Sequence, residues 1–255
     1  MLHHFLRGST KLKTIGIASG KGGVGKTTVA TNLAYALAKA NYRVMLVDGD
    51  FGLANVQLAL GLQAKHNIGH YLRGEKTLKE ITITTSDGLM VVPGASGVGG
   101  LANLKPEELN GFIKGLINPA DPIDYLIFDA AAGISDNVIL LLKECDESLI
   151  VIRDDPSSIA DGYGIIKVLH TEHSYKSIGV IANSVESESV GKSLFSRINS
   201  ACIKFLGIEL PYVGYVEEDT AIKDASKKYK PVLEAFPSSK ASVNFRALAK
   251  AVAGR

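Results

Sequence analysis

The chain has 255 residues, of which 46% are hydrophobic and 21% charged, and its formal net charge is +2. This composition is that of one α/β domain of a soluble protein, and so balanced a charge neither demands nor forbids nucleic acid. The two cysteines, Cys145 and Cys202, are too few for a disulfide framework and lack metal-ligand spacing, and no apolar run reaches the roughly 20 residues that span a bilayer. We therefore expect a protein of the reducing cytoplasm.

Short runs rich in β-branched residues alternate with helical patterns along the whole chain. We predict strands over the ranges 14–19, 43–48, 89–93, 125–129, 148–153, 178–183 and 211–215. Because these strands are apolar throughout and helical segments separate them, they predict a doubly wound, mainly parallel α/β sheet with helices on both faces. No stretch resembles an interdomain linker, so we expect a flexible extension over 1–13 and a single domain over 14–255.

Three helices can be predicted from the spacing of apolar residues and from a cap. One covers 26–40, and a second begins at Pro156-Ser157-Ser158, which offers an N-terminal cap, and continues to about His170. The third carries an apolar stripe of seven residues: Val190, Leu194, Phe195, Ile198, Cys202, Phe205 and Leu206. Because Cys202 lies within this stripe, we interpret it as a core thiol.

A phosphate-binding loop is the strongest motif in the sequence. Residues 20–27 read GKGGVGKT, which fits G-x-x-x-x-G-K-[ST] between a predicted strand and a predicted helix. The glycines let backbone N–H groups converge on phosphate oxygens, and the helix directs its positive end at the same anion. Lys26 is expected to reach the β- and γ-phosphates, and the Thr27 hydroxyl to bind Mg²⁺. The predicted nucleotide-binding residues of the loop are Gly20, Lys21, Gly22, Gly23, Val24, Gly25, Lys26, Thr27 and Thr28.

Carboxylates follow two of the predicted strands. Asp48 and Asp50 end the second strand, and Asp129 ends the fourth. In a doubly wound sheet the carboxyl ends of the strands open onto the crevice that also holds the phosphate loop. Carboxylates there suit a Mg²⁺ ion that keeps most of its water ligands. Each one alone could instead accept hydrogen bonds from nearby backbone amides, which is common at strand ends.

The segment 20–28, GKGGVGKTT, resembles the deviant Walker A motif of the MinD/ParA ATPases, and the resemblance extends from about residue 13 to residue 251. It implies a slow, Mg²⁺-dependent ATPase that binds ATP and ADP and forms a homodimer with ATP. In that family the early lysine, here Lys21, reaches the ATP of the other subunit, as an arginine finger does. By the same resemblance Asp50 orients the attacking water, while Asp48 and Asp129 lie around Mg²⁺ together with Thr27. The implied catalytic residues are Lys21, Lys26 and Asp50.

The resemblance also implies a position for the adenine base. Asn183, which ends the strand 178–183, stands where the family carries an adenine-contacting asparagine, and an amide can pair with the N6 and N7 edge of adenine. A turn asparagine without a ligand is almost equally compatible with the sequence. Glu217 replaces the proline that the family usually carries in the loop beside the base.

Several further segments resemble one branch of the family, the flagellar-number regulators FlhG, FleN and YlxH. They cover 48–56, 93–97, 101–104, 129–135 and 156–167. The branch implies control of the placement or number of flagella through flagellar assembly proteins: an FlhF-like GTPase, a transcriptional regulator or a switch-complex protein. The chain departs from the branch in three places. Gln57 stands where an acidic residue is expected, Arg153-Asp154-Asp155 replaces a more neutral run, and 1–13 lacks the motif that stimulates the GTPase.

Two surface features leave further partners open. Phe245, Leu248, Ala249 and Val252 form a C-terminal stripe that could lie on an anionic membrane surface, although we favour a helix that packs on the sheet. A basic patch comprises Lys223, Lys227, Lys228 and Lys230. It could contact DNA, as in a ParA-type partitioning ATPase, but a solvated helix face is the interpretation that we favour.

Two other classes of protein fit the sequence less well than a nucleotide switch does. An electron-transfer ATPase of the nitrogenase iron-protein type needs cysteines in the loops 93–100 and 130–135, and these contain none. A module that binds nucleotide without turnover is disfavoured by Lys21, Asp50 and Asp129, and only a hydrolysis rate excludes it.

Overall fold

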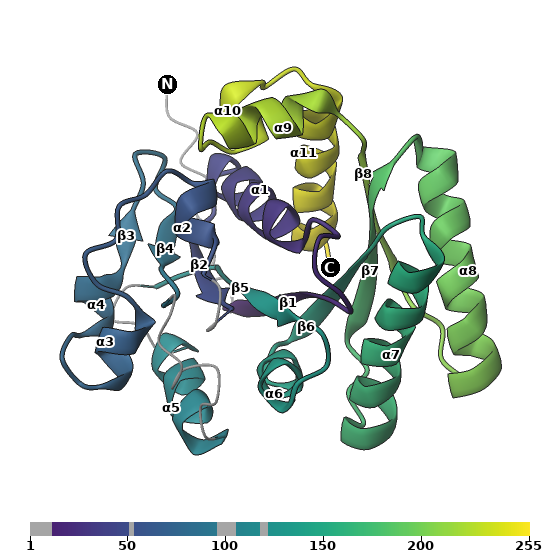
Figure 1. Ribbon diagram of the computed structural model, residues 1–255, viewed down its shortest axis with the longest axis horizontal. Coiled ribbons are helices and arrows are strands. Elements are labelled where there is room, and N and C mark those ends of the chain that lie inside the picture. The colour runs from purple at the N-terminus through teal and green to yellow at the C-terminus, as the bar shows by residue number, and fades with distance from the viewer. Residues whose placement is uncertain (1–11, 51–53, 96–105, 118–121) are drawn as a thin grey trace.

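The computed structural model of the chain describes residues 12–50, 54–95, 106–117 and 122–255, and these form one α/β domain (Figure 1). Eight strands make a single sheet in the order β3-β4-β2-β5-β1-β6-β7-β8. Their bounds are β1 Lys13–Ser19, β2 Val44–Gly49, β3 Ile83–Thr84, β4 Met90–Val92, β5 Tyr125–Ala132, β6 Glu147–Ile152, β7 Ile178–Val185 and β8 Tyr212–Glu217. The predicted doubly wound, mainly parallel sheet is thereby confirmed.

Helices cover both faces of this sheet (Figure 1). Their bounds are α1 Lys26–Lys39, α2 Val56–Ala59, α3 Ile68–Leu72, α4 Leu78–Ile81, α5 Pro106–Ile117, α6 Asp136–Lys143, α7 Pro156–His173, α8 Glu188–Leu206, α9 Thr220–Lys227, α10 Val232–Ala235 and α11 Lys240–Ala253. One core cluster joins the sheet to α1, α10 and α11, and the other joins it to α5, α6, α7 and α8. Buried side chains on both faces explain why the strands read as continuous apolar runs rather than as alternating patterns.

One strand escaped the sequence analysis. β3 is two residues long and pairs antiparallel with β4, whereas every other pairing in the sheet is parallel. Only a turn joins β3 to β4, so the alternation of strand and helix that predicted the other strands is missing there. The predicted strand boundaries agree with the observed ones to within about three residues. The extension over 1–13 falls largely outside the described residues, and β1 begins at Lys13.

Helix α7 begins with a different cap from the predicted one. Asp155 is the N-cap, and its Oδ1 accepts a hydrogen bond from the backbone N–H of Ser158 at 2.8 Å. Pro156 occupies the first helical turn, where its missing N–H costs nothing and its fixed φ suits the helix. The predicted cap at Pro156-Ser157-Ser158 was therefore wrong by one residue, and the helix continues to His173.

The apolar stripe of α8 is confirmed except for Phe205. Leu194, Ile198 and Cys202 are buried, while the Phe205 side chain is 65% exposed beneath the ammonium group of Lys204. From Cys202 the stripe advances by four residues to Leu206, which packs against the core, so Phe205 lies on the flank of the helix. Burial raises the pKa of the Cys202 thiol to about 11, in keeping with the predicted inert core cysteine.

The C-terminal stripe belongs to the core. Phe245, Leu248, Ala249 and Val252 are all buried on α11, which packs beside α1 and β8 (Figure 1). The favoured interpretation, a helix that packs on the fold, is confirmed, and this stripe is not available to a membrane in the described fold. Among the described residues no helix is both long and apolar enough to cross a bilayer.

Candidate functional site: a phosphate loop beside strand-end carboxylates

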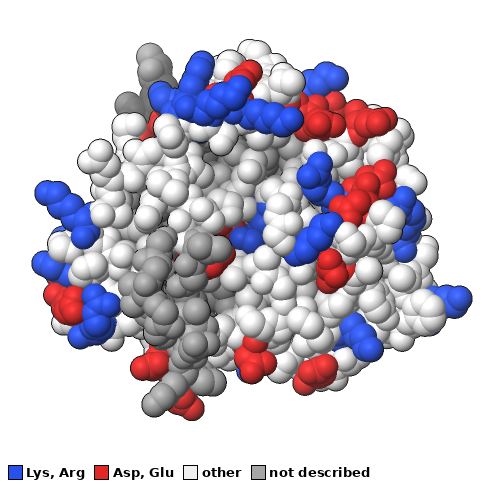
Figure 2. Space-filling model, viewed as in Figure 1, with Lys and Arg blue, Asp and Glu red and all other residues white. Residues whose placement is uncertain are grey.

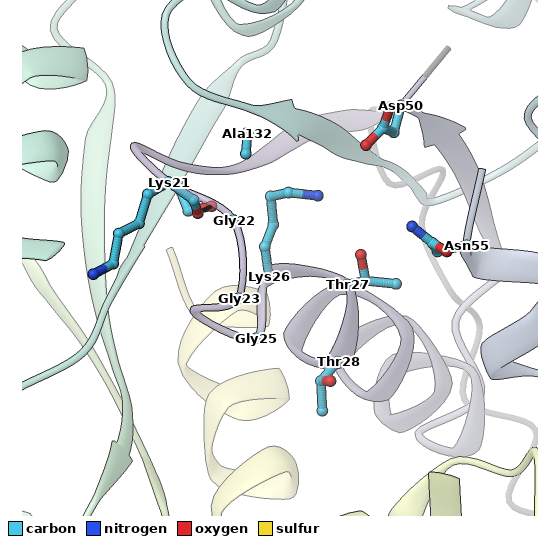
Figure 3. A pocket seen from close by; sticks show the side chains of 11 residues that line it. Lys21, Gly22, Gly23, Gly25, Lys26, Thr27, Thr28, Asp50, Asn55 and Ala132 are labelled. Carbon is cyan, nitrogen blue, oxygen red and sulfur yellow. Dashed lines mark hydrogen bonds between the residues drawn. The ribbon is translucent and has the colours of Figure 1, made fainter. Parts of the chain in front are cut away.

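The loop between β1 and α1 forms most of the wall of a cavity of about 420 Å³ at the carboxyl ends of the strands. Figure 3 shows the loop curving around the cavity into the first turn of α1. Gly25 has φ 89°, a left-handed conformation that favours glycine, and a Cβ there would lie 2.3 Å from Nδ2 of Asn183. A Cβ at Gly20 would lie 2.3 Å from the backbone of Asp161 on α7. Glycine is therefore required at both positions for the loop to close on its neighbours.

Three side chains of the site meet at Asp129. Lys26 Nζ lies 2.6 Å from Asp129 Oδ1, and Thr27 Oγ1 donates to Asp129 Oδ2 at 2.6 Å. Asp129 and Lys26 are almost fully buried, at 1% and 8% exposed. Burial raises the pKa of Asp129, and the Lys26 ammonium and the Thr27 hydroxyl oppose that rise. The predicted phosphate lysine, metal-binding threonine and strand-end aspartate therefore form one contiguous cluster.

Asp48 and Asp50 differ although they are two residues apart. Asp48 is fully buried, and its carboxylate accepts backbone N–H groups of Asp50, Asn55 and Val56 at 2.8 to 3.2 Å. Burial, and then the charge of Asp129, raise the pKa of Asp48 to about 7. Asp50 lines the cavity instead, and Figure 3 shows its carboxylate across the cavity from the loop. The metal role of Asp48 and the water-orienting role of Asp50 stay predictions.

Lys21 extends away from the other charged groups of the site. In Figure 3 its side chain points to the opposite side from Lys26, Thr27 and Asp50. Its Nζ lies 2.9 Å from Asp155 Oδ1, beside the Ser157 hydroxyl at the start of α7. Hydrogen bonds from Ser157 and Lys21 lower the pKa of Asp155. Lys21 thus contributes to the wall of the phosphate cavity, while its ammonium group is held at the start of α7, away from the Lys26 cluster.

A second cavity, of about 270 Å³, lies next to the first. Both cavities have Gly23, Gly25 and Thr28 in their walls, so the phosphate loop separates the first cavity from the second. Asn183, which is 6% exposed, lies in this second cavity and donates from Nδ2 to the carbonyl of Val24 at 2.7 Å. The bond from Asn183 to Val24 fixes the phosphate loop against the end of β7. The contact of Asn183 with adenine stays a prediction.

The donor set fits a nucleotide that brings its own Mg²⁺. Among the described residues no three His, Cys, Asp or Glu side chains converge as a metal-binding group. Mg²⁺ takes few protein ligands and keeps waters and phosphate oxygens, for which Thr27 and the carboxylate of Asp129 suffice. Open space surrounds Gly22 and Gly23, where an added Cβ would meet nothing within 4 Å. The loop N–H groups and Lys26 would hold the phosphates there, and the metal would neutralise charge that develops on them.

Several residues at the site were missed or left open by sequence reasoning. Asn55 lines the phosphate cavity, and Arg153 and Ser184 line the second one. Asn55 lies within the 48–56 segment, which was a sufficient signal, whereas no motif marked Ser184. Asp155 belongs to a run noted only as unusual. The segments 51–53 and 96–104, which carry part of the predicted branch resemblance, lie outside the described residues.

A mainly parallel sheet with a glycine-rich loop at a helix N-terminus, a buried lysine and a buried aspartate on the strand beside the loop defines a P-loop nucleotide-binding protein. The family model described as the CobQ/CobB/MinD/ParA nucleotide binding domain matches residues 15–232. The chain belongs to this family.

Known relatives place the chain more narrowly within the family. It is 39% identical to the antiactivator FleN of Pseudomonas aeruginosa, over 94% of this chain and 86% of FleN. It is 34% identical to the flagellum site-determining protein YlxH of Helicobacter pylori, over 91% and 78% of the two chains. The structure of the septum site-determining protein MinD from Pyrococcus horikoshii, complexed with Mg-ADP, matches with a TM-score of 0.80 at 27% identity over 94% and 96% of the chains. The predicted resemblance to MinD/ParA ATPases and to the FleN and YlxH branch is confirmed.

Proposed function

We propose that this chain is a nucleotide switch that binds ATP with Mg²⁺, dimerises in that state, and returns to the monomer by slow hydrolysis. The main support for this proposal is the cluster of Lys26, Thr27 and Asp129 beside the P-loop, in which Lys26 Nζ and Thr27 Oγ1 each lie 2.6 Å from an oxygen of Asp129. It supplies a cation for the phosphates, a hydroxyl for the metal and a carboxylate for the metal's water shell. Asp50, on the cavity wall, is the group that would orient the attacking water.

The position of Lys21 supports dimerisation as part of the switch. A lysine needed by its own phosphates would direct its ammonium group toward Lys26 and Thr27, but the Lys21 ammonium is turned away from them and pairs with Asp155. From there a second subunit that faces this one could receive Lys21 at its own nucleotide. Lys21 would then exchange its ion pair with Asp155 for a contact with a phosphate of the partner's nucleotide. This exchange requires a partner that has ATP bound.

The output that we propose is control of the number or placement of flagella. The relatives named antiactivator FleN and flagellum site-determining protein YlxH support it, since this chain covers most of each. The partners would be flagellar assembly proteins: a transcriptional activator of the kind that an antiactivator opposes, an FlhF-like GTPase or a switch-complex protein. A DNA-partitioning role is less well supported, because Lys227 and Lys230 are paired with Asp224 and Glu234. Figure 2 shows acidic side chains beside the lysines at the top of the molecule.

The test is the mass in solution of an Asp50→Ala variant, with ADP and with ATP plus Mg²⁺. We expect a monomer with ADP and a dimer with ATP, because ATP persists when the attacking water is not oriented. Adding Lys21→Ala should abolish the dimer while ATP still binds. An unchanged mass with ATP demonstrably bound would contradict the switch. Phosphate release by the unmodified chain, compared with Asp50→Ala, tests turnover separately.

A further inference from the structure

The second cavity is bounded on one side by Arg153, the first residue of the unusual run after β6. Arg153 lines this cavity together with Asn183, Ser184 and Ile222. The cavity adjoins the phosphate loop, and the loop lies between it and the Lys26 cluster. If the proposed function holds, this neighbouring cavity is where we expect the base and ribose of a nucleotide whose phosphates lie on the loop.

Hydrogen bonds hold both the backbone and the side-chain tip of Arg153. The backbone N–H of Arg153 donates to Ser158 Oγ at 2.9 Å, which sets the turn before α7. At the other end Nη2 donates to Ser184 Oγ at 3.3 Å, so the side chain spans from the end of β6 to the end of β7. A side chain already ordered in this way loses little rotamer freedom when a ligand binds.

Ser184 adopts a backbone conformation that is rare for a residue with a side chain. Its φ is 54°, and the register of β7 against β8 shifts between Asn183 and Val185. This left-handed residue interrupts the alternation of the strand and brings the Ser184 hydroxyl to the wall of the cavity, where it meets Arg153. Such local strain is found where a side chain must be placed for binding.

We propose that Arg153 is a base-binding residue: its planar guanidinium packs on the purine ring of the bound nucleotide. Arginine suits this role because the guanidinium is flat, weakly hydrated and attracted to the face of an aromatic ring. Arg153 then adds affinity for a purine nucleotide over a pyrimidine one, since the smaller ring offers less face. The inference rests on the proposed nucleotide site. It adds to that site Arg153, which belongs to the run Arg153-Asp154-Asp155 that replaces a more neutral run of the family.

The test compares binding of ATP, CTP and inorganic tripolyphosphate, each with Mg²⁺, by calorimetry on the full chain. Arg153→Ala should weaken ATP binding about tenfold and CTP binding less, and leave tripolyphosphate binding unchanged. Arg153→Lys keeps the positive charge without the plane, so it should resemble Arg153→Ala. The matched control is Arg197→Ala. Arg197 lies on α8 and is not among the residues that line the cavity, but its guanidinium binds Asp154, the residue after Arg153, at 2.9 Å.

The outcomes separate this inference from the function on which it rests. Equal ATP affinity in Arg153→Ala and the unmodified chain would overturn the role of Arg153 alone, as would full recovery by Arg153→Lys. An equal loss of tripolyphosphate and ATP binding would assign Arg153 to the phosphates and also overturn it. If the unmodified chain binds neither ATP nor tripolyphosphate, the proposed nucleotide site itself is wrong.

Discussion

The phosphate end and the base end of the candidate site are built in different ways. The phosphate end comes from one continuous loop, Gly20 to Thr28, with the buried carboxylate of Asp129 on β5 beside it. The base end is assembled from the loop, the ends of β6 and β7, and the segment that leads into α9. A phosphate is recognised mainly by backbone N–H groups and charge, which a short motif can supply. A base is recognised by walls of side chains, which distant segments must bring together.

This contrast indicates which part of a binding site can be predicted from local sequence. The phosphate end is defined by residue spacing, so a change there should affect every phosphate ligand. The base end is defined by tertiary contacts, so a change there should affect only ligands that carry a base. The predictions below test this division, beginning with the largest expected effect.

Lys26→Ala should abolish nucleotide binding, with a loss on the order of 100-fold or more for ATP and tripolyphosphate alike. It also leaves Asp129 buried without its cation, so the free energy of unfolding should fall by about 3 kcal/mol. Calorimetry measures the first effect and urea denaturation the second. Adding Asp129→Asn should recover much of the stability and none of the binding. Recovery of binding would show that Lys26 acts only as the partner of Asp129.

Gly25→Ala tests the point at which the two ends meet. The positive φ and the 2.3 Å approach to Asn183 Nδ2 are both unfavourable to a Cβ, so we expect a loss of about 1–3 kcal/mol of stability and weaker ATP binding. Combining it with Asn183→Ala removes the contact but leaves the strain in φ, so recovery should be partial. Gly22→Ala is the matched control for stability, because its Cβ meets nothing within 4 Å. Equal losses in the two glycine variants would contradict the geometry of the loop.

Asp48→Ala and Asp48→Asn separate a structural role of this carboxylate from a chemical one. Asp48→Ala leaves three backbone N–H groups without their acceptor and should cost about 2 kcal/mol, whereas Asp48→Asn keeps an acceptor and should cost less. Urea denaturation without nucleotide or Mg²⁺ measures both. Equal stability of Asp48→Ala and the unmodified chain would show that the three bonds do not matter to the fold.

The same residue gives a pH dependence with a defined sign. The folded-state pKa of Asp48 is raised to about 7, above the ordinary value of about 4. Its contribution to stability is therefore fully present below about pH 4 and is lost as the pH rises through about 7. Relative to Asp48→Asn, the unmodified chain should lose stability between these values. A difference between the two that stays constant over this window would contradict the raised pKa.

The fold and the phosphate end could be predicted because local physics determines them. Continuous apolar strands separated by helices indicate a covered parallel sheet, and glycine spacing before a helix indicates the loop. The same reasoning missed β3, since a two-residue antiparallel edge strand has too few side chains to form a pattern. It placed Phe205 in the core because spacing alone does not say how wide the buried face of a helix is.

The base end could be predicted only in part. Asn183 was found through family resemblance, but its bond to the Val24 carbonyl depends on a loop 159 residues away in sequence. Arg153 stood out as a departure, and nothing in the sequence showed that it would meet Ser184. Residues that act through contacts between separate strand ends carry no local pattern, so only the folded chain shows their arrangement.

The smallest expected effect concerns Asp155, which connects the two ends because it follows Arg153 in the chain and holds Lys21. Asp155→Ala removes the N-cap of α7 and should lower Tm by roughly 2–4 °C near pH 7. Because the folded-state pKa of Asp155 is lowered, its contribution is present above about pH 4 and shrinks as the pH falls below that value. The Tm difference between Asp155→Ala and the unmodified chain should therefore narrow in acid, as thermal scans at several pH values would show.

A comparison with Ser187→Ala separates the cap of α7 from the release of Lys21. Ser187 caps α8 through the backbone N–H of Val190, and its hydroxyl also pairs with that of Ser189. Both variants should lower Tm modestly, but only Asp155→Ala should free Lys21 and so favour the ATP-dependent dimer. If Asp155→Ala and Ser187→Ala dimerise equally in the Asp50→Ala background, the ion pair with Asp155 does not restrain Lys21, and the loop after β6 serves the base end alone.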